Sequence, residues 1–191
     1  MSDKDVKEKI LAKFYELATH HGIKRITIDM LAKECGISKK TVYKYFQSKD
    51  EIVNKFANSI IKTLSNEFDK IQLLEENPEQ VMNKFFEIIY EIIKTIPTTI
   101  IEDARRFYPE IEKKIEKIRG EYTIIFIKNI KKGIKAGVFR DINPKFIEGF
   151  YTAAVERVFN PDFILENNLT VQESIASLRT MLLYGLINTD K

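Results

Sequence analysis

The stretch Thr27–Phe46 constrains the fold of this chain more than any other part of the sequence. Thr27 can cap a helix, and the apolar residues that follow recur at helical spacing on one face: Ile28, Leu31, Ala32 and Cys35. Gly36 comes next, and glycine readily takes the left-handed conformation that ends a helix. Ser38 can cap a second helix, in which Val42 and Phe46 share an apolar face. The stretch therefore predicts two short helices joined by a tight turn, a helix-turn-helix.

The other face of the second helix is basic and aromatic, with Lys39, Lys40, Tyr43 and Lys44. Residues 36–49 contain four lysines and no acidic residue, so positive charge gathers where phosphate groups would need neutralising. A short helix with an apolar back and a lysine and tyrosine front fits the major groove of DNA. This pattern favours a DNA-binding regulator.

Helical periodicity and capping signals continue through the rest of the chain, and we expect an all-α fold of about nine helices. Seven glycines and five prolines among 191 residues leave few turns. Residues 1–47 are expected to form a three-helix, helix-turn-helix DNA-binding domain, and residues 48–191 a second helical domain. The expected helices cover residues 4–21, 27–35, 38–46, 48 to 71 or 74, 77–95, 99–107, 109–136, 143–159 and 170–186.

The last two of these helices are apolar around most of their circumference, unlike the others. Such helices need cover on all sides, and terminal helices of a small domain rarely receive it from their own chain. Pairing of two copies would supply this cover as a two-fold, four-helix interface. The residues expected in this homodimer interface are Ile147, Tyr151, Val155, Phe159, Leu178, Leu182 and Leu186.

Residues 9–56 resemble the DNA-binding domain of the TetR (tetracycline-repressor) family of bacterial transcription regulators. The motifs that carry the resemblance are Thr27-Ile-Asp-Met-Leu-Ala, Cys-Gly-Ile-Ser, Thr41-Val-Tyr-Lys-Tyr-Phe46 and the following Lys49, with no insertion between them. Lys135-Ala-Gly-Val-Phe-Arg140 is also similar to family members. Residues 57–191 otherwise resemble the family only in the number and order of helices. The resemblance implies that residues 48–191 are a ligand-binding and dimerisation domain. It implies a homodimer paired through its eighth and ninth helices, with a ligand cavity among helices four to seven.

The resemblance also implies DNA contacts, position by position. Lys39, Lys40 and Tyr43 match positions that reach base edges. Thr27 and Lys49 match phosphate contacts at helix N-termini, which favour anions. Thr41 and Tyr45 match positions that contact the DNA backbone, and Ser38 can cap its helix, contact phosphate or do both. For any single lysine, a solvated surface charge is the alternative.

An apolar cavity for a small-molecule effector is expected from Phe86, Ile89, Tyr90, Ile93, Phe107, Tyr122 and Phe126. The same residues at helical spacing also suit a plain core, and the identity of the ligand stays open. We expect the ligand to shift the fourth helix and so to change the separation of two DNA-reading heads. Two heads related by a two-fold axis must meet major grooves about 34–36 Å apart, so the expected operator is palindromic. The ligand and the operator are expected to compete, and the expected regulator is a repressor that the ligand releases.

An enzyme is not expected, because the sequence has no Gly-rich phosphate loop, no Cys/His metal spacing and no Ser/His/Asp set in a plausible context. No cofactor and no metal are expected. The alternative is a helical dimer whose headpiece binds nucleic acid nonspecifically, or binds protein, with no ligand response. A single cysteine, a polar N-terminus and no long apolar run predict a cytoplasmic protein without a membrane partner.

Overall fold

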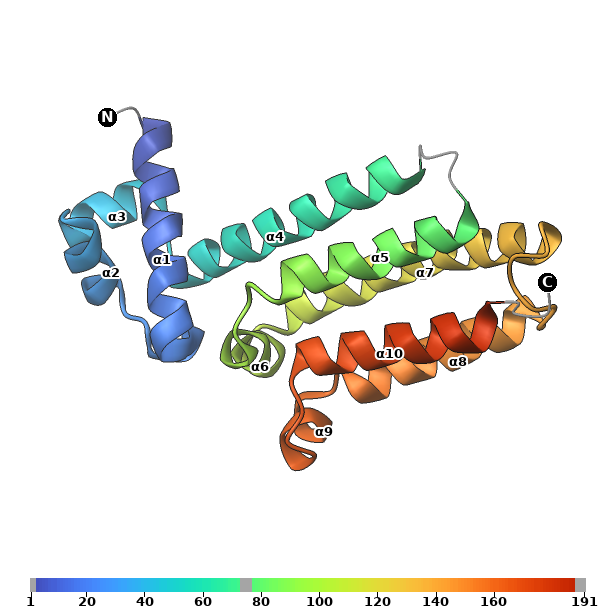
Figure 1. Ribbon diagram of the computed structural model, residues 1–191. Helices are drawn as coiled ribbons and strands as arrows, with labels where there is room; N and C mark the ends of the chain where they lie inside the picture. The colour runs from blue at the N-terminus through green and yellow to red at the C-terminus, as the bar shows by residue number, and fades with distance from the viewer. Residues whose placement is uncertain (1–2, 73–76, 188–191) are drawn as a thin grey trace. The chain divides into compact units, whose positions relative to one another are not determined.

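The computed structural model describes residues 3–72 and 77–187, and in these ranges the chain forms ten α-helices (Figure 1). Their bounds are α1 Asp3–Arg25, α2 Ile28–Cys35, α3 Lys39–Tyr45, α4 Lys49–Gln72, α5 Pro78–Ile93, α6 Thr98–Phe107, α7 Pro109–Lys135, α8 Pro144–Val158, α9 Pro161–Glu166 and α10 Val171–Leu186. Extended pairing in the described ranges is limited to an isolated bridge between Phe139 and Ile187. The expected all-α class is confirmed.

The chain divides into two compact units. The first comprises Met1–Lys62 with Ile96–Lys114, and the second comprises Thr63–Thr95 with Ile115–Lys191. Helices α4 and α7 therefore contribute residues to both units, and α6 belongs with the N-terminal helices. The domain boundary after residue 47 stays a prediction, and the sequence carries no signal that would place α6 in the first unit.

The helix-turn-helix forms through the local signals that the sequence carries. The Thr27 hydroxyl caps α2 by accepting a hydrogen bond from the Met30 N–H at 3.2 Å. Gly36 ends α2 in the left-handed conformation, at φ 65° and ψ 33°. The Ser38 hydroxyl caps α3 by accepting a hydrogen bond from the Thr41 N–H at 3.0 Å. The turn between the two helices is thus set by one glycine and two hydroxyl caps.

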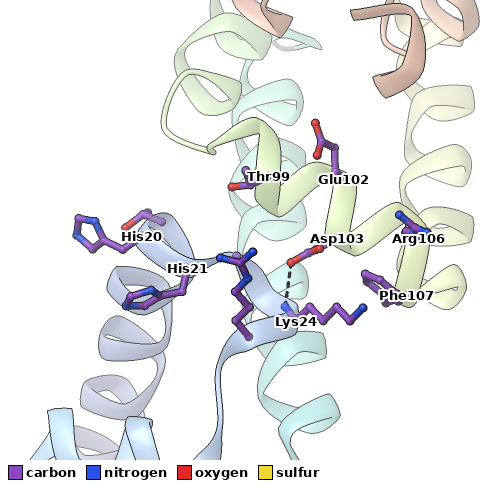
Figure 2. Close-up of a pocket in the computed structure, with 11 residues that line it drawn as sticks. His20, His21, Lys24, Thr99, Glu102, Asp103, Arg106 and Phe107 are labelled. Carbon is purple, nitrogen blue, oxygen red and sulfur yellow. Dashed lines mark hydrogen bonds between the residues drawn. The ribbon is translucent and has the colours of Figure 1, made fainter. Parts of the chain in front are cut away.

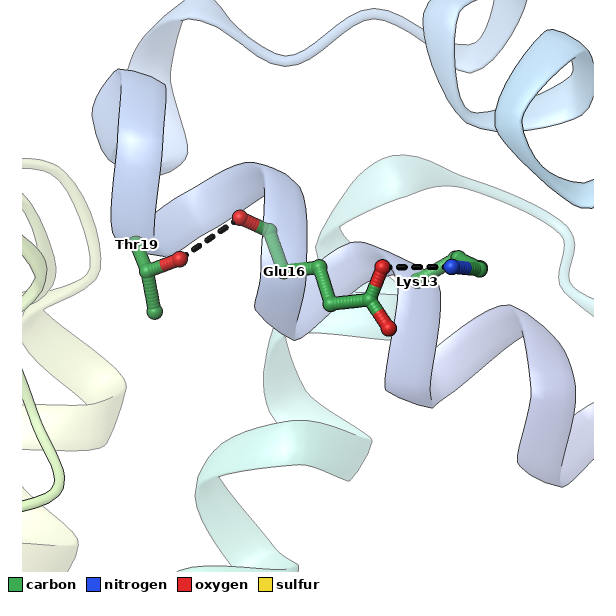
Figure 3. A network of polar contacts seen from close by, with 3 residues as sticks. All are labelled: Lys13, Glu16 and Thr19. Carbon is green, nitrogen blue, oxygen red and sulfur yellow. Dashed lines mark hydrogen bonds and ion pairs between the residues drawn. The ribbon is translucent and has the colours of Figure 1, made fainter.

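Helix α1 contains a kink at Gly22, whose φ of 72° and ψ of 161° are not helical. Before the kink, the surface of α1 carries a small polar network, in which Lys13 pairs with the Glu16 carboxylate and the Thr19 hydroxyl donates to the Glu16 carbonyl (Figure 3). After the kink, the Lys24 N–H donates to the Asp103 carboxylate of α6 at 2.8 Å. The end of α1 is therefore fastened to α6 inside the first unit.

The second unit is built around aromatic rings from α4, α5, α7 and α8. Phe68 stacks on Tyr122 with ring centroids 3.8 Å apart, and Phe126 stacks on Tyr151 at 4.5 Å. Phe85 lies edge-on to Phe68 at 5.0 Å. Such offset and edge-on arrangements are favourable for aromatic pairs. These rings join four helices into one core.

The main differences from the expected helices are an additional helix, α9, and a first helix that continues past the kink at Gly22 to Arg25, where the sequence predicts an end at residue 21. Helix α9 was not expected, although Asn160-Pro161 repeats the Asn-Pro start signal of α5 and α8. Its six residues are too few to show helical periodicity, so this start signal was the one available clue. Helix α4 ends at Gln72, and the alternative end at residue 74 lies outside the described residues. In the part of the chain that the structure describes, no helix combines the length and apolarity needed to cross a bilayer.

Candidate nucleic-acid interface

Helix α3 has a buried back and an exposed front. Val42 is fully buried and Phe46 is 3% exposed, so this side of α3 packs into the first unit. Lys39, Lys40 and Tyr43 are exposed on the outer surface, with 47% of Tyr43 accessible. Exposed lysines can donate to base edges, and an exposed aromatic ring beside them can contact thymine methyl groups. The front of α3 has the chemistry of a major-groove reader.

The hydroxyl groups of Thr27, Ser38 and Thr41, near the exposed front of α3, already make hydrogen bonds within the protein. Thr27 and Ser38 each accept a backbone N–H, and the hydroxyls of Ser38 and Thr41 are hydrogen-bonded at 2.8 Å. A hydroxyl that accepts a hydrogen bond keeps its own proton as a donor. Capping and donation to a phosphate oxygen are therefore chemically compatible at Thr27.

Two aspartates from outside α3 contact its polar side chains. Lys39 Nζ lies 2.9 Å from the Asp29 carboxylate of α2. The Tyr45 hydroxyl donates to the Asp3 carboxylate of α1 at 2.6 Å, and Lys44 Nζ lies 3.7 Å from the same carboxylate. The hydrogen bond from Tyr45 and the charge of Lys44 lower the pKa of Asp3. Neither aspartate was expected at this surface.

Lys49 occupies a different setting from the other candidate lysines. It is the first residue of α4, and its Nζ donates to the Lys24 carbonyl at 3.0 Å. Burial lowers the pKa of the Lys49 ammonium. Lys49 thus links the start of α4 to the end of α1, and its phosphate contact stays a prediction.

These contacts revise the charge pattern seen in the sequence. Of the four lysines in residues 36–49, Lys39 and Lys44 face carboxylates and Lys49 engages a carbonyl. Lys40 is exposed, and the described residues include no ion-pair or hydrogen-bond partner for its ammonium. The unpaired positive charge of this front is therefore smaller than a count of lysines indicates.

A polar cleft of about 640 Å³ lies in the first unit, where the end of α1 meets α6 (Figure 2). Lys24 Nζ lies 4.6 Å from the centre of the Phe107 ring, and the Arg106 guanidinium lies 5.6 Å from it. The cleft is lined by Thr19, His20, His21, Gly22, Lys24, Arg25, Thr99, Glu102, Asp103, Arg106 and Phe107. Among the described residues, no group of three or more His, Cys, Asp or Glu side chains is arranged to hold a metal ion.

The cavity residues expected from the sequence are not gathered in this cleft. Phe107 alone among them lines it. Phe86, Tyr122 and Phe126 are buried in the aromatic core of the second unit. On α5, Ile89 and Ile93 are partly exposed and Tyr90 is 38% exposed. An effector cavity formed by these residues stays a prediction.

The last two expected helices are α8 and α10 in the structure. Burial within one chain limits which of their side chains can contact a second chain. Five of the seven expected interface residues, Ile147, Tyr151, Leu178, Leu182 and Leu186, are at most 6% exposed. Their side chains pack into the core of their own unit, while Val155 and Phe159 are partly exposed. The large apolar side chains left open on these helices are Phe146, Phe150, Met181 and Tyr184. The dimer itself stays a prediction.

Comparison with known proteins places the helix-turn-helix in a family of regulators. Residues 10–56 match the family model of the bacterial regulatory proteins of the tetR family. The chain is 21% identical over 184 residues to YvaF of Bacillus subtilis, an uncharacterized HTH-type transcriptional regulator, and the alignment covers 94% of each chain.

Solved structures share the fold along nearly the whole chain. A TetR transcription regulator from Haloarcula marismortui matches with a TM-score of 0.71 and 20% identity, covering 93% of this chain and 94% of that one. A proposed transcriptional regulator from Saccharomonospora viridis, solved in complex with choline, matches with a TM-score of 0.74 and 15% identity, covering 97% and 100%. At these identities the likeness establishes the fold alone.

Proposed function

We propose that this chain, which belongs to the TetR family of bacterial DNA-binding transcriptional regulators, is a repressor that binds a palindromic operator as a homodimer and releases it on binding a small molecule. The observation that carries the proposal is the exposed front of α3, where Lys39, Lys40 and Tyr43 stand over a buried back. Such a helix reads base edges, while neighbouring side chains position it on phosphates.

The homodimer is supported by the exposed apolar side chains of the last long helices. Phe146 and Met181 are 67% and 64% exposed, and Tyr184 is 79% exposed. Exposed apolar groups of this size are typical of a surface that another protein covers. A two-fold pairing through this surface would present two α3 helices to a palindrome. The protein would act in the cytoplasm, where the bacterial chromosome lies.

Ligand response is supported by the connection between α6 and the helix-turn-helix unit. Asp103 of α6 accepts the Lys24 N–H just after the kink of α1. A ligand that moved α6 would therefore act on the helix that braces α2 and α3. A fold relative from S. viridis was solved in complex with choline, which supports a small molecule as the effector class. The effector and the operator would then compete through linkage.

Selection from random double-stranded DNA tests the proposal. We expect the protein to enrich a palindrome with half-sites about one helical turn apart. Enrichment of no sequence, together with strongly salt-sensitive binding, would instead support a nonspecific nucleic-acid headpiece. A second measurement titrates the enriched operator with candidate small molecules, and at least one ligand is expected to weaken binding.

A further inference from the structure

The front of α3 carries acidic partners that a phosphate-binding surface does not need. Asp29 reaches Lys39 at 2.9 Å, and Asp3 reaches both Tyr45 at 2.6 Å and Lys44 at 3.7 Å. The carboxylates come from α2 and α1, so the tertiary fold brings them to α3. Three of the polar groups that α3 presents are therefore held by carboxylates in the free protein.

These ion pairs add little to the stability of the fold. The side chains of Lys39 and Asp29 are 50% and 69% exposed, and those of Lys44 and Asp3 are 66% and 78% exposed. Ion pairs this open contribute little to stability, because water screens them and ordering two long side chains costs entropy. We expect these ion pairs to affect instead the affinity of α3 for DNA.

Random DNA and an operator would meet this surface differently. Nonspecific binding comes almost wholly from lysines and arginines that neutralise phosphates. A lysine that stays with a carboxylate neutralises no phosphate, and one that leaves it exposes a negative charge to the DNA. Both routes weaken nonspecific binding.

The carboxylate pairs weaken hydrogen bonding to base edges less than they weaken nonspecific phosphate binding, and they can strengthen it. A lysine ammonium has more N–H donors than the one that Asp29 engages, so the paired Lys39 can still donate to guanine O6 and N7. Pairing also fixes the position of the ammonium, which reduces the entropy lost when a base contact forms. A paired donor therefore favours the correct base edge over an arbitrary phosphate.

We propose that Asp29 and Asp3 are specificity-determining residues of α3: Asp29 holds the Lys39 ammonium for base edges, and both carboxylates lower the affinity of α3 for random DNA. This inference rests on the DNA-binding function proposed above.

The test compares neutral variants with a matched charge control. Asp29→Asn and Asp3→Asn each remove one carboxylate, whereas Glu34→Gln removes an exposed carboxylate from the other side of α2, about 140° around the helix from Asp29. Asp29→Glu keeps a carboxylate within reach of Lys39. For each full-length protein, dissociation constants are measured for the selected operator and for a random duplex across a salt series.

The aspartate variants are expected to bind the random duplex about threefold to tenfold more tightly than the wild type, with a smaller gain on the operator. The salt dependence on random DNA should steepen by about one unit of slope for each lysine released. Glu34→Gln should change both affinities in parallel, and Asp29→Glu should keep the wild-type ratio.

Two results overturn the inference while leaving the proposed function in place. An unchanged ratio of operator to random affinity in both aspartate variants would remove their role in specificity, even if the wild type selects a palindrome. A change in the ratio that Glu34→Gln reproduces would assign the effect to net charge alone. A wild type that enriches no sequence would overturn the proposed function and this inference together. Circular dichroism melts of the variants check that each is folded.

Discussion

At the scale of single residues, neighbouring lysines of one basic segment have different environments. Lys40 points to solvent, Lys39 faces Asp29, and Lys49 donates to the Lys24 carbonyl. Their side chains are chemically identical, but the groups around them decide which DNA atoms each can reach. Substitutions at these positions should therefore differ in kind as well as in size.

Lys39→Ala and Tyr43→Ala are expected to relax sequence preference, because both side chains are exposed on the surface of α3 that we propose to contact base edges. Each should cost about 1–3 kcal/mol on the operator and much less on random DNA. Lys49→Ala should weaken binding to all sequences alike, and should also lower the melting temperature because the hydrogen bond to the Lys24 carbonyl is lost. Equal losses on operator and random DNA for all three variants would contradict these roles.

Tyr108 predicts a loss of stability at alkaline pH. Burial, with the charges of Asp50 and Asp103 nearby, raises the pKa of the Tyr108 phenol to about 12 from its ordinary value of 10.0. Because the pKa of Tyr108 is higher in the folded protein than in the unfolded chain, the neutral phenol contributes to the free energy of unfolding. This contribution is complete below pH 10 and is lost as the pH rises through about 12. Melting temperatures across this range should fall less steeply in Tyr108→Phe than in the wild type. Equal slopes would contradict the assignment.

At the scale of the secondary-structure elements, the kink in α1 lies where the helix that precedes the helix-turn-helix contacts α6. Gly22 combines a positive φ with close approach of the Asp103 carboxylate, since a Cβ at this position would lie 2.8 Å from Asp103 Oδ2. The same carboxylate accepts the Lys24 N–H. The position of the Asp103 side chain therefore depends on a glycine at residue 22, and the Lys24 N–H depends on Asp103 for its hydrogen bond.

Gly22→Ala is expected to destabilise the protein by about 1–3 kcal/mol, because alanine meets both backbone strain and the Asp103 oxygen. Gly120→Ala is the matched control: Gly120 lies inside α7, and a Cβ there would meet no atom within 4 Å. That variant should stabilise the protein by about 0.5–1 kcal/mol. Urea unfolding of both variants measures the difference. Equal midpoints for the two alanine variants would show that Gly22 is not constrained.

At the scale of the whole molecule, the open apolar side chains of α8 and α10 point to assembly. Met181 and Tyr184 are largely exposed on α10, next to a row of leucines that the chain buries by itself. The buried row stabilises one chain, and the exposed side chains are free to meet a second chain. Substitutions in the two sets should therefore separate folding from association.

Met181→Lys and Tyr184→Lys are expected to raise the dimer dissociation constant at least about tenfold and to leave the melting of the isolated chain nearly unchanged. Ile124→Lys provides the control, since Ile124 is 71% exposed on α7, outside the expected interface. Analytical ultracentrifugation over a concentration series gives the dissociation constants. Association as strong as in the wild type would place the interface elsewhere.

The sequence alone determined what depends on neighbouring residues along the chain. Helix starts at Thr27, Ser38 and Thr170 were predicted because a cap contacts backbone atoms two or three residues away. The buried back and basic front of α3 also followed from helical spacing. Local patterns of caps and apolar spacing are thus sufficient to recognise the helix-turn-helix and to tell the buried side of α3 from its exposed side.

Only the tertiary structure decided what depends on residues far apart in sequence. Asp3 meets Tyr45 across 42 positions, and Asp103 meets Lys24 across 79, and no local pattern encodes either contact. The same holds for α8 and α10, which are apolar on several faces, so that the helices packed against them select which face is buried. Local hydrogen bonding fixes the helices, and packing between distant segments fixes which of their side chains remain available for function.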